Sequence, residues 1–104
     1  MNRTIKSIRI PLSRECRRRF EAHAGTLNMS NSSFARMLIS KQLSEEKNIQ
    51  IDLTNANLPI SYETYIQTYL PVNLDSQIED IVQSTDYDKS KLAWYLVMKG
   101  METI

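Results

Sequence analysis

The chain has 104 residues, which is a common size for one folded domain and too few for two independent hydrophobic cores. Apolar residues make up 41% and charged residues 24%, a balance that argues against a disordered chain. No apolar run approaches the roughly 20 residues that a membrane-spanning helix needs, so we expect no membrane insertion. The lone cysteine, Cys16, excludes an intrachain disulfide and fits a reducing compartment, which favours a cytoplasmic protein.

The net charge of +1 conceals a strong asymmetry along the chain. When the chain is divided after Leu43, the first part holds nine lysines and arginines against two acids, and the remainder holds four against ten. The two parts therefore carry +7 and −6. A basic half of this kind predicts a nucleic-acid surface. The alternative is two solvated faces of opposite sign, and charge alone does not separate the two interpretations.

The N-terminal segment has the alternation of a strand with one buried face. Ile8, Ile10 and Leu12 alternate with Ser7, Arg9 and Pro11. We therefore expect the isoleucines and the leucine to face a core and the other three side chains to face outward.

Two helices are predicted after this strand. Ser13 can cap the first helix, and Gly25 is expected to weaken or end it. Its apolar side chains recur at helical spacing: Cys16, Phe20, Ala24 and Leu27. Ser30 marks the start of the second helix, in which Phe34 and Leu38 lie on the apolar side. Residues 1–43 therefore form a strand-helix-helix unit.

A polar segment separates this unit from a second one. Residues 44–61 are rich in turn formers and are interpreted as a linker, and residues 62–104 repeat the apolar pattern at the offset that separates Ile8 from Ile66. The matches are Ile66, Thr68 and Leu70 in the strand, Leu74, Ile78 and Val82 in the next helix, and Asp88 as the last cap. Pairing Pro11 with Pro71 would lengthen the offset between the strands by two, and this even shift keeps every side chain on the same face.

These two units resemble the ribbon-helix-helix family of DNA-binding proteins of the Arc, MetJ and CopG type. The resemblance is carried by Ser7–Ser13 and Leu27–Phe34 in the first unit, and by Tyr65–Leu70 and Asp86–Leu92 in the second. It implies a mainly α fold in which the two strands pair as an antiparallel β-ribbon. The tandem repeats 1–43 and 62–104 would then form one domain, 1–104, with pseudo-twofold symmetry.

The resemblance implies that the outer face of the ribbon enters the major groove of double-stranded DNA, which a two-stranded ribbon fits. Strand alternation places five side chains on that face as candidate base contacts: Ser7, Arg9, Tyr65, Gln67 and Tyr69. Arg9 could pair with guanine and Gln67 with adenine.

In this family the start of the second helix of each unit touches the DNA backbone, where free N–H groups and the positive end of the helix dipole suit a phosphate. The corresponding candidates are Ser30, Asn31 and Ser32 in the first unit, and Lys89, Ser90 and Lys91 in the second. Arg3 and Lys6 are further phosphate candidates near the first strand. Ser30 and Asp88 are expected to be helix caps in any case. The acids of the second unit predict unequal DNA contacts by the two halves.

The sequence offers little for catalysis. It has one histidine, His23, one cysteine and no glycine-rich loop, so we expect no enzyme, no cofactor and no metal site. Cys16 lies on an apolar stripe and is interpreted as core packing.

The tandem arrangement is similar to the TraY-type accessory proteins of conjugative plasmids, which assist a relaxase near a transfer origin. We therefore expect a relaxosome accessory factor or a transcriptional repressor, with double-stranded DNA, a relaxase and further copies of the chain along DNA as partners. Two alternatives stay open. One is the antitoxin of a toxin-antitoxin pair, and the other is a protein-interaction module that does not bind DNA.

Overall fold

The protein is described by a computed structural model that covers residues 6–45, 60–85 and 88–102. The elements follow one another as strand β1 (Lys6–Leu12), helices α1 (Arg14–Thr26) and α2 (Asn31–Glu45), strand β2 (Thr64–Leu70), and helices α3 (Val72–Thr85) and α4 (Lys89–Glu102). The order strand-helix-helix thus occurs twice, and each element of the second set begins at the same offset from its counterpart in the first. None of the helices in these three ranges is both long and apolar enough to cross a membrane.

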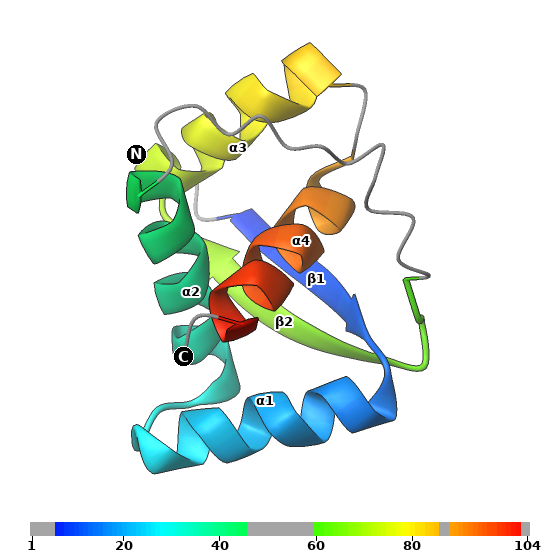
Figure 1. Ribbon diagram of the computed structural model, residues 1–104. Coiled ribbons are helices and arrows are strands. Elements are labelled where there is room, and N and C mark those ends of the chain that lie inside the picture. The colour runs from blue at the N-terminus through cyan, green and yellow to red at the C-terminus, as the bar shows by residue number, and fades with distance from the viewer. Residues whose placement is uncertain (1–5, 46–59, 86–87, 103–104) are drawn as a thin grey trace.

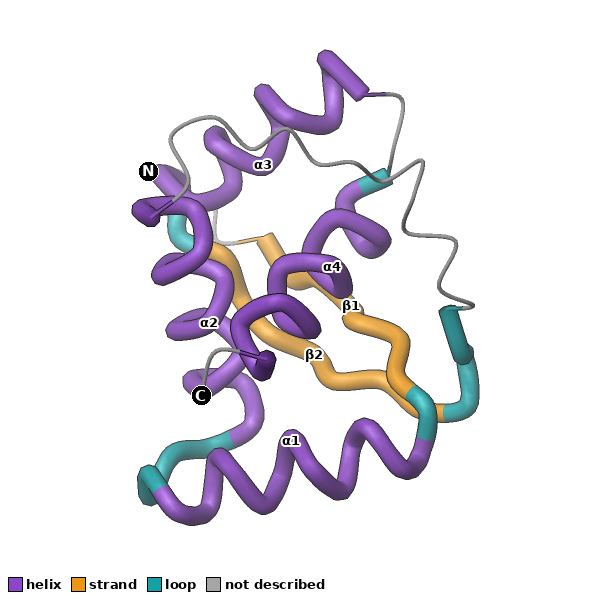
Figure 2. The backbone as a smooth tube through the Cα atoms, in the orientation of Figure 1, coloured by secondary structure: helices purple, strands orange, loops and turns teal. Residues whose placement is uncertain are grey.

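The two strands form one antiparallel ribbon, as Figure 2 shows. Arg9 lies opposite Gln67 at the centre of the register, and Lys6 and Leu12 lie opposite Leu70 and Thr64 at its ends. Six side chains on one face of the ribbon are buried, namely Ile8, Ile10, Leu12, Ile66, Thr68 and Leu70, and Thr64 at the start of β2 is half-buried on the same face. The predicted strands, their antiparallel pairing and their buried face are therefore confirmed.

The four helices cover the buried face of the ribbon. α2 packs against β2, α4 packs against β1, and the two helices pack against each other. α1 and α3 lie toward opposite ends of the molecule (Figure 1). All six elements contribute to one cluster of buried apolar side chains, in which Phe20 and Phe34 lie with their ring centroids 4.8 Å apart. The predicted mainly helical fold with a two-stranded ribbon is confirmed.

The end of α1 differs from the prediction. Phe20 and Ala24 are buried as expected, but Leu27 is 50% exposed, because the helix ends at Thr26. Asn28 has a left-handed backbone with φ 57°, and the N–H of Met29 donates to the carbonyl oxygen of Ala24 at 2.9 Å. This is the hydrogen bonding of a Schellman motif, so Asn28 ends the helix and Gly25 does not.

The boundaries of the predicted linker are only partly described. α2 includes Ser44 and Glu45, which the prediction assigned to the linker, and β2 begins at Thr64. Residues 46–59, the greater part of the linker, lie outside the described residues.

Gly100 allows α2 and α4 to approach closely, and we expect Gly100→Ala to destabilise the protein. An added Cβ would lie 3.1 Å from Cδ2 and 3.2 Å from Cβ of Leu38, so this fully buried side chain would have to move by a few tenths of an ångström within the packed core. Overpacking of this kind costs about 1–3 kcal/mol. Gly25→Ala is the control, because nothing lies within 4 Å of its added Cβ and alanine favours the helix by roughly 0.5–1 kcal/mol. In urea unfolding, the free energy of unfolding should be higher for Gly25→Ala than for the native chain, and lower for Gly100→Ala. Equal stabilisation by both changes would contradict the close approach of α2 and α4.

Candidate nucleic-acid interface

The outer face of the ribbon brings the five predicted base-contact residues together. Ser7, Arg9, Tyr65, Gln67 and Tyr69 are all exposed, and the two tyrosines retain 46% and 49% of their accessible surface. Arg9 and Gln67 face each other across the strands, and Ser7 faces Tyr69. Residues directly opposite in an antiparallel pair have Cβ atoms about 4.5–5.5 Å apart, so a guanidinium and an amide project side by side from the middle of the ribbon.

Gln67 is held in place by a neighbour on the other strand. Its Nε2 donates a hydrogen bond to Oγ of Ser7 at 2.7 Å. An amide carries two N–H donors and a carbonyl acceptor, so this bond leaves one donor and the acceptor for another partner. At the far end of the same face, Pro11 lies opposite Tyr65 and is buried. The accessible part of the face is therefore centred on Arg9 and Gln67.

The first turn of α2 carries a chain of polar contacts. Oγ of Ser30 accepts from the backbone N–H of Ser33 at 3.1 Å, which confirms Ser30 as the N-cap. Arg36, one turn further along, donates from Nη2 to Oγ of Ser33 at 3.2 Å. The guanidinium thus lies beside the start of the helix, where the helix dipole also favours an anion.

Ser32 is directed toward the ribbon. Its hydroxyl lies 3.0 Å from Oγ1 of Thr68, and Oγ1 of Thr68 donates to the backbone carbonyl oxygen of Ser32 at 2.7 Å. Thr68 is fully buried on the inner face of β2, and these bonds fix the first turn of α2 against that strand. The Ser32 hydroxyl is therefore used within the fold, while the predicted phosphate contact of this residue stays a prediction.

We expect Thr68→Val to lower the free energy of unfolding by about 0.5–1.5 kcal/mol, because a buried hydroxyl and its hydrogen bonds are lost with little change in shape. Thr64→Val is the control: its hydroxyl donates to the Leu12 carbonyl oxygen at 3.1 Å but is only half-buried. Guanidinium unfolding should show the larger loss for Thr68→Val. A neutral result there would mean that the Thr68–Ser32 contact does not anchor α2.

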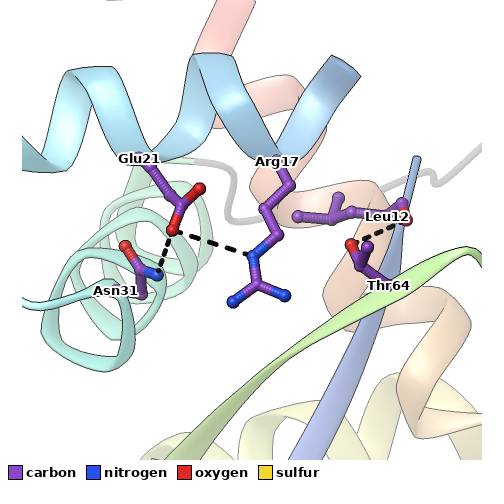
Figure 3. A network of polar contacts seen from close by, with 5 residues as sticks. All are labelled: Leu12, Arg17, Glu21, Asn31 and Thr64. Atoms are coloured by element: carbon purple, nitrogen blue, oxygen red, sulfur yellow. Dashed lines mark hydrogen bonds and ion pairs between the residues drawn. The ribbon is translucent and has the colours of Figure 1, made fainter. Parts of the chain in front are cut away.

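Asn31 takes part in a network between α1 and α2, which Figure 3 shows. Nδ2 of Asn31 donates to Oε2 of Glu21 at 3.3 Å, and Nε of Arg17 lies 3.8 Å from the same oxygen. Arg17 and Glu21 are one turn apart on α1, and both are partly exposed. The carboxylate of Glu21 is thus partly neutralised at the start of α2.

The start of α4 is surrounded by acidic side chains, whereas the start of α2 has the guanidinium of Arg36 beside it. Oδ1 of Asp88 accepts from the backbone N–H of Lys91 at 2.8 Å, which confirms Asp88 as the N-cap. Nζ of Lys89 lies 3.0 Å from Oδ1 of Asp75 and also contacts Oε1 of Glu79, both on α3. The hydrogen bond to Glu79 is the main cause of a raised Lys89 pKa, which burial opposes and Asp75 reinforces. Lys89 is therefore charged at neutral pH and held by two carboxylates.

The remaining phosphate candidates are only partly described. Ser90 and Lys91 lie in the first turn of α4 and are half-buried. Lys6 begins β1, but its side chain is not described, and Arg3 lies outside the described residues.

No protein-family model, curated protein or solved structure matches this chain. Its interface is therefore interpreted from its own geometry and chemistry.

Sequence reasoning missed three contributors to this region. Arg36 was not selected, although its place one turn after Ser33 on a helix is a usable signal. Thr68 was matched only as an inward-facing position, and its role in holding α2 has no local signal. The pairing of Lys89 with Asp75 and Glu79 joins residues of two different helices, so it depends on how α3 and α4 cross.

Proposed function

We propose that the chain binds double-stranded DNA by placing its ribbon in the major groove, and that its two halves are tandem ribbon-helix-helix units. The observation that carries the proposal is the ribbon itself. Its inner face packs against the helices, and its outer face presents Arg9 and Gln67 side by side between exposed tyrosines. A two-stranded ribbon fits the major groove, where each base pair offers a distinct set of donors and acceptors.

The spacing of the elements supports a pseudo-twofold relation between the halves. Every element of the second half starts at one constant offset from its counterpart, and the same offset separates Arg9 from Gln67, on which the strand register is centred. A twofold axis between these two residues requires both relations. The offset that pairs Ile8 with Ile66 is therefore favoured over the one that pairs Pro11 with Pro71.

Side-chain contacts support the same relation. In each half, two side chains one turn apart on the first helix and the first residue of the second helix form a polar triad, centred on Glu21 in the first half and on Lys89 in the second. The triads are Arg17, Glu21 and Asn31 in the first half, and Asp75, Glu79 and Lys89 in the second. Corresponding members of the triads are separated by the same offset as the strands. In the first half the cation of the triad is Arg17 on the first helix, whereas in the second half it is Lys89 on the second helix.

The chemistry of the outer face fits base recognition. A guanidinium can donate two hydrogen bonds to O6 and N7 of guanine, and a glutamine amide can pair with N6 and N7 of adenine. At the start of α2, backbone N–H groups, the exposed Ser30 and Arg36 offer donors and positive charge to a phosphate. In this proposal the ribbon determines the sequence preference, and the start of α2 positions the chain on the DNA backbone.

In the cell, the proposed role is that of a binding protein and not of an enzyme. It would act on plasmid DNA as a relaxosome accessory factor, with a relaxase as partner, or as a transcriptional repressor in the cytoplasm. Both roles require the same ribbon in the major groove, so the first test is DNA binding itself.

Binding to a fluorescent duplex should be measured by anisotropy between about 50 and 200 mM salt, where the logarithm of the affinity should fall linearly with the logarithm of salt concentration. Arg36→Gln should weaken binding and make this slope shallower by about the contribution of one phosphate contact. Lys41→Gln is the matched control, because it removes the same charge from an exposed position further along α2. Absence of binding at the lowest salt would overturn the proposal and favour a protein-interaction module.

A further inference from the structure

We infer that the ribbon recognises a non-palindromic DNA sequence and that the chain binds it in a single orientation. The inference rests on the proposed function. It follows from differences between the two strands and between the two helix starts, which a binder of palindromes would keep alike.

The two strands present different chemistry at corresponding places. A twofold axis between Arg9 and Gln67 relates Ser7 to Tyr65 and Pro11 to Tyr69. One member of the last pair, Pro11, is buried, whereas Tyr69 is half-exposed. None of the three pairs repeats a side chain, so the two halves of the outer face differ at every position.

These differences change which bases each half can recognise. Arginine finds two acceptors only on guanine, whereas the glutamine amide matches the donor and acceptor of adenine. The rings of Tyr65 and Tyr69 add apolar area of the kind that contacts a thymine methyl group, and one ring lies on each side of the axis: Tyr69 opposite the exposed Ser7, and Tyr65 opposite the buried Pro11. The two half-sites therefore face different side chains, and we expect guanine at the place of Arg9 and adenine at that of Gln67.

The two helix starts give the complex its direction. At the start of α2 the N-cap is neutral Ser30, and Arg36 lies beside it. At the start of α4 the N-cap is Asp88, and Lys89 is held by two carboxylates. The position that corresponds to Arg36 is Trp94, which is buried. Phosphates therefore find their anchor at the first half, and turning the chain around on the same site loses this contact.

The test is selection of bound duplexes from a pool with a random central segment. We expect a consensus without twofold symmetry. Two palindromes made by repeating either half of that consensus should each bind at least about tenfold more weakly than the selected site, since one mismatched contact costs roughly 1–3 kcal/mol. A palindromic consensus, or a palindrome that binds as well as the selected site, would overturn the inference and leave DNA binding intact.

A variant makes the same test from the side of the protein. Tyr65→Ser with Gln67→Arg gives β2 the side chains of β1 at two corresponding positions, so the consensus should become more nearly palindromic. Tyr62→Ser with Gln83→Arg makes the same two changes at exposed positions outside the ribbon and should leave the consensus unchanged. An unchanged consensus for the ribbon variant, checked for folding by circular dichroism, would overturn the inference. Complete lack of binding by the native chain would instead overturn the proposed function, and the inference with it.

Discussion

Replacing both Arg9 and Gln67 by alanine is expected to lower the preference for a selected site over unrelated duplex by about 100-fold. Each good bidentate pair with a base contributes roughly 1–3 kcal/mol of discrimination, and each 1.4 kcal/mol is a factor of about ten. Binding to unrelated duplex should fall much less, because it depends on phosphate contacts and loses only one positive charge. The measurement is the ratio of the two dissociation constants at one salt concentration.

The control for this variant removes the same residue types elsewhere. Arg18 and Gln83 are exposed on α1 and α3 and lie outside the ribbon. Arg18→Ala with Gln83→Ala should lower both affinities by similar factors and leave their ratio unchanged. Both side chains of the central pair are exposed, so their loss should not alter the unfolding midpoint. An unchanged ratio in the Arg9 and Gln67 variant would remove the ribbon from sequence recognition.

The face of each strand could be predicted from sequence because alternation is a local property. A side chain in a strand points to the side opposite that of its neighbours, so Ile8 and Ile10 fix the outward position of Arg9 once the segment is extended. Helix starts were predictable for a similar reason. Ser13, Ser30 and Asp88 accept hydrogen bonds from N–H groups three residues ahead of them.

Contacts between helices could not be predicted from such local patterns. The pairing of Lys89 with α3 depends on the angle and rotation at which two helices meet, and sequence spacing does not encode either. For this reason the acids of the second half were expected to repel DNA, whereas Asp75 and Glu79 are partly neutralised by Lys89. The exposed Leu27 has a local origin instead: a left-handed residue, Asn28, ends the helix before the apolar stripe is complete.

The pairing of Lys89 with two carboxylates leads to the second large effect that we expect. In Asp75→Asn with Glu79→Gln, both carboxylates that hold Lys89 become neutral amides of nearly the same shape. Lys89 then offers its charge to a phosphate at the start of α4, as the proposed twofold relation requires. One added phosphate contact changes the salt slope by about 0.9, which corresponds to roughly an eightfold gain in affinity at about 0.1 M salt.

The control separates this anchor from a general change in charge. Glu63→Gln with Asp80→Asn removes two exposed acids that do not contact Lys89, and it should raise the affinity only slightly because exposed charges are screened within about 10 Å at about 0.1 M salt. Adding Lys89→Gln to the Asp75 and Glu79 variant should abolish the gain and return the slope to its native value. Equal gains in both double variants would mean that net charge, and not a second phosphate anchor, governs the affinity. Since the ribbon is unchanged in all of these variants, their selected sequence should stay the same while affinity alone responds.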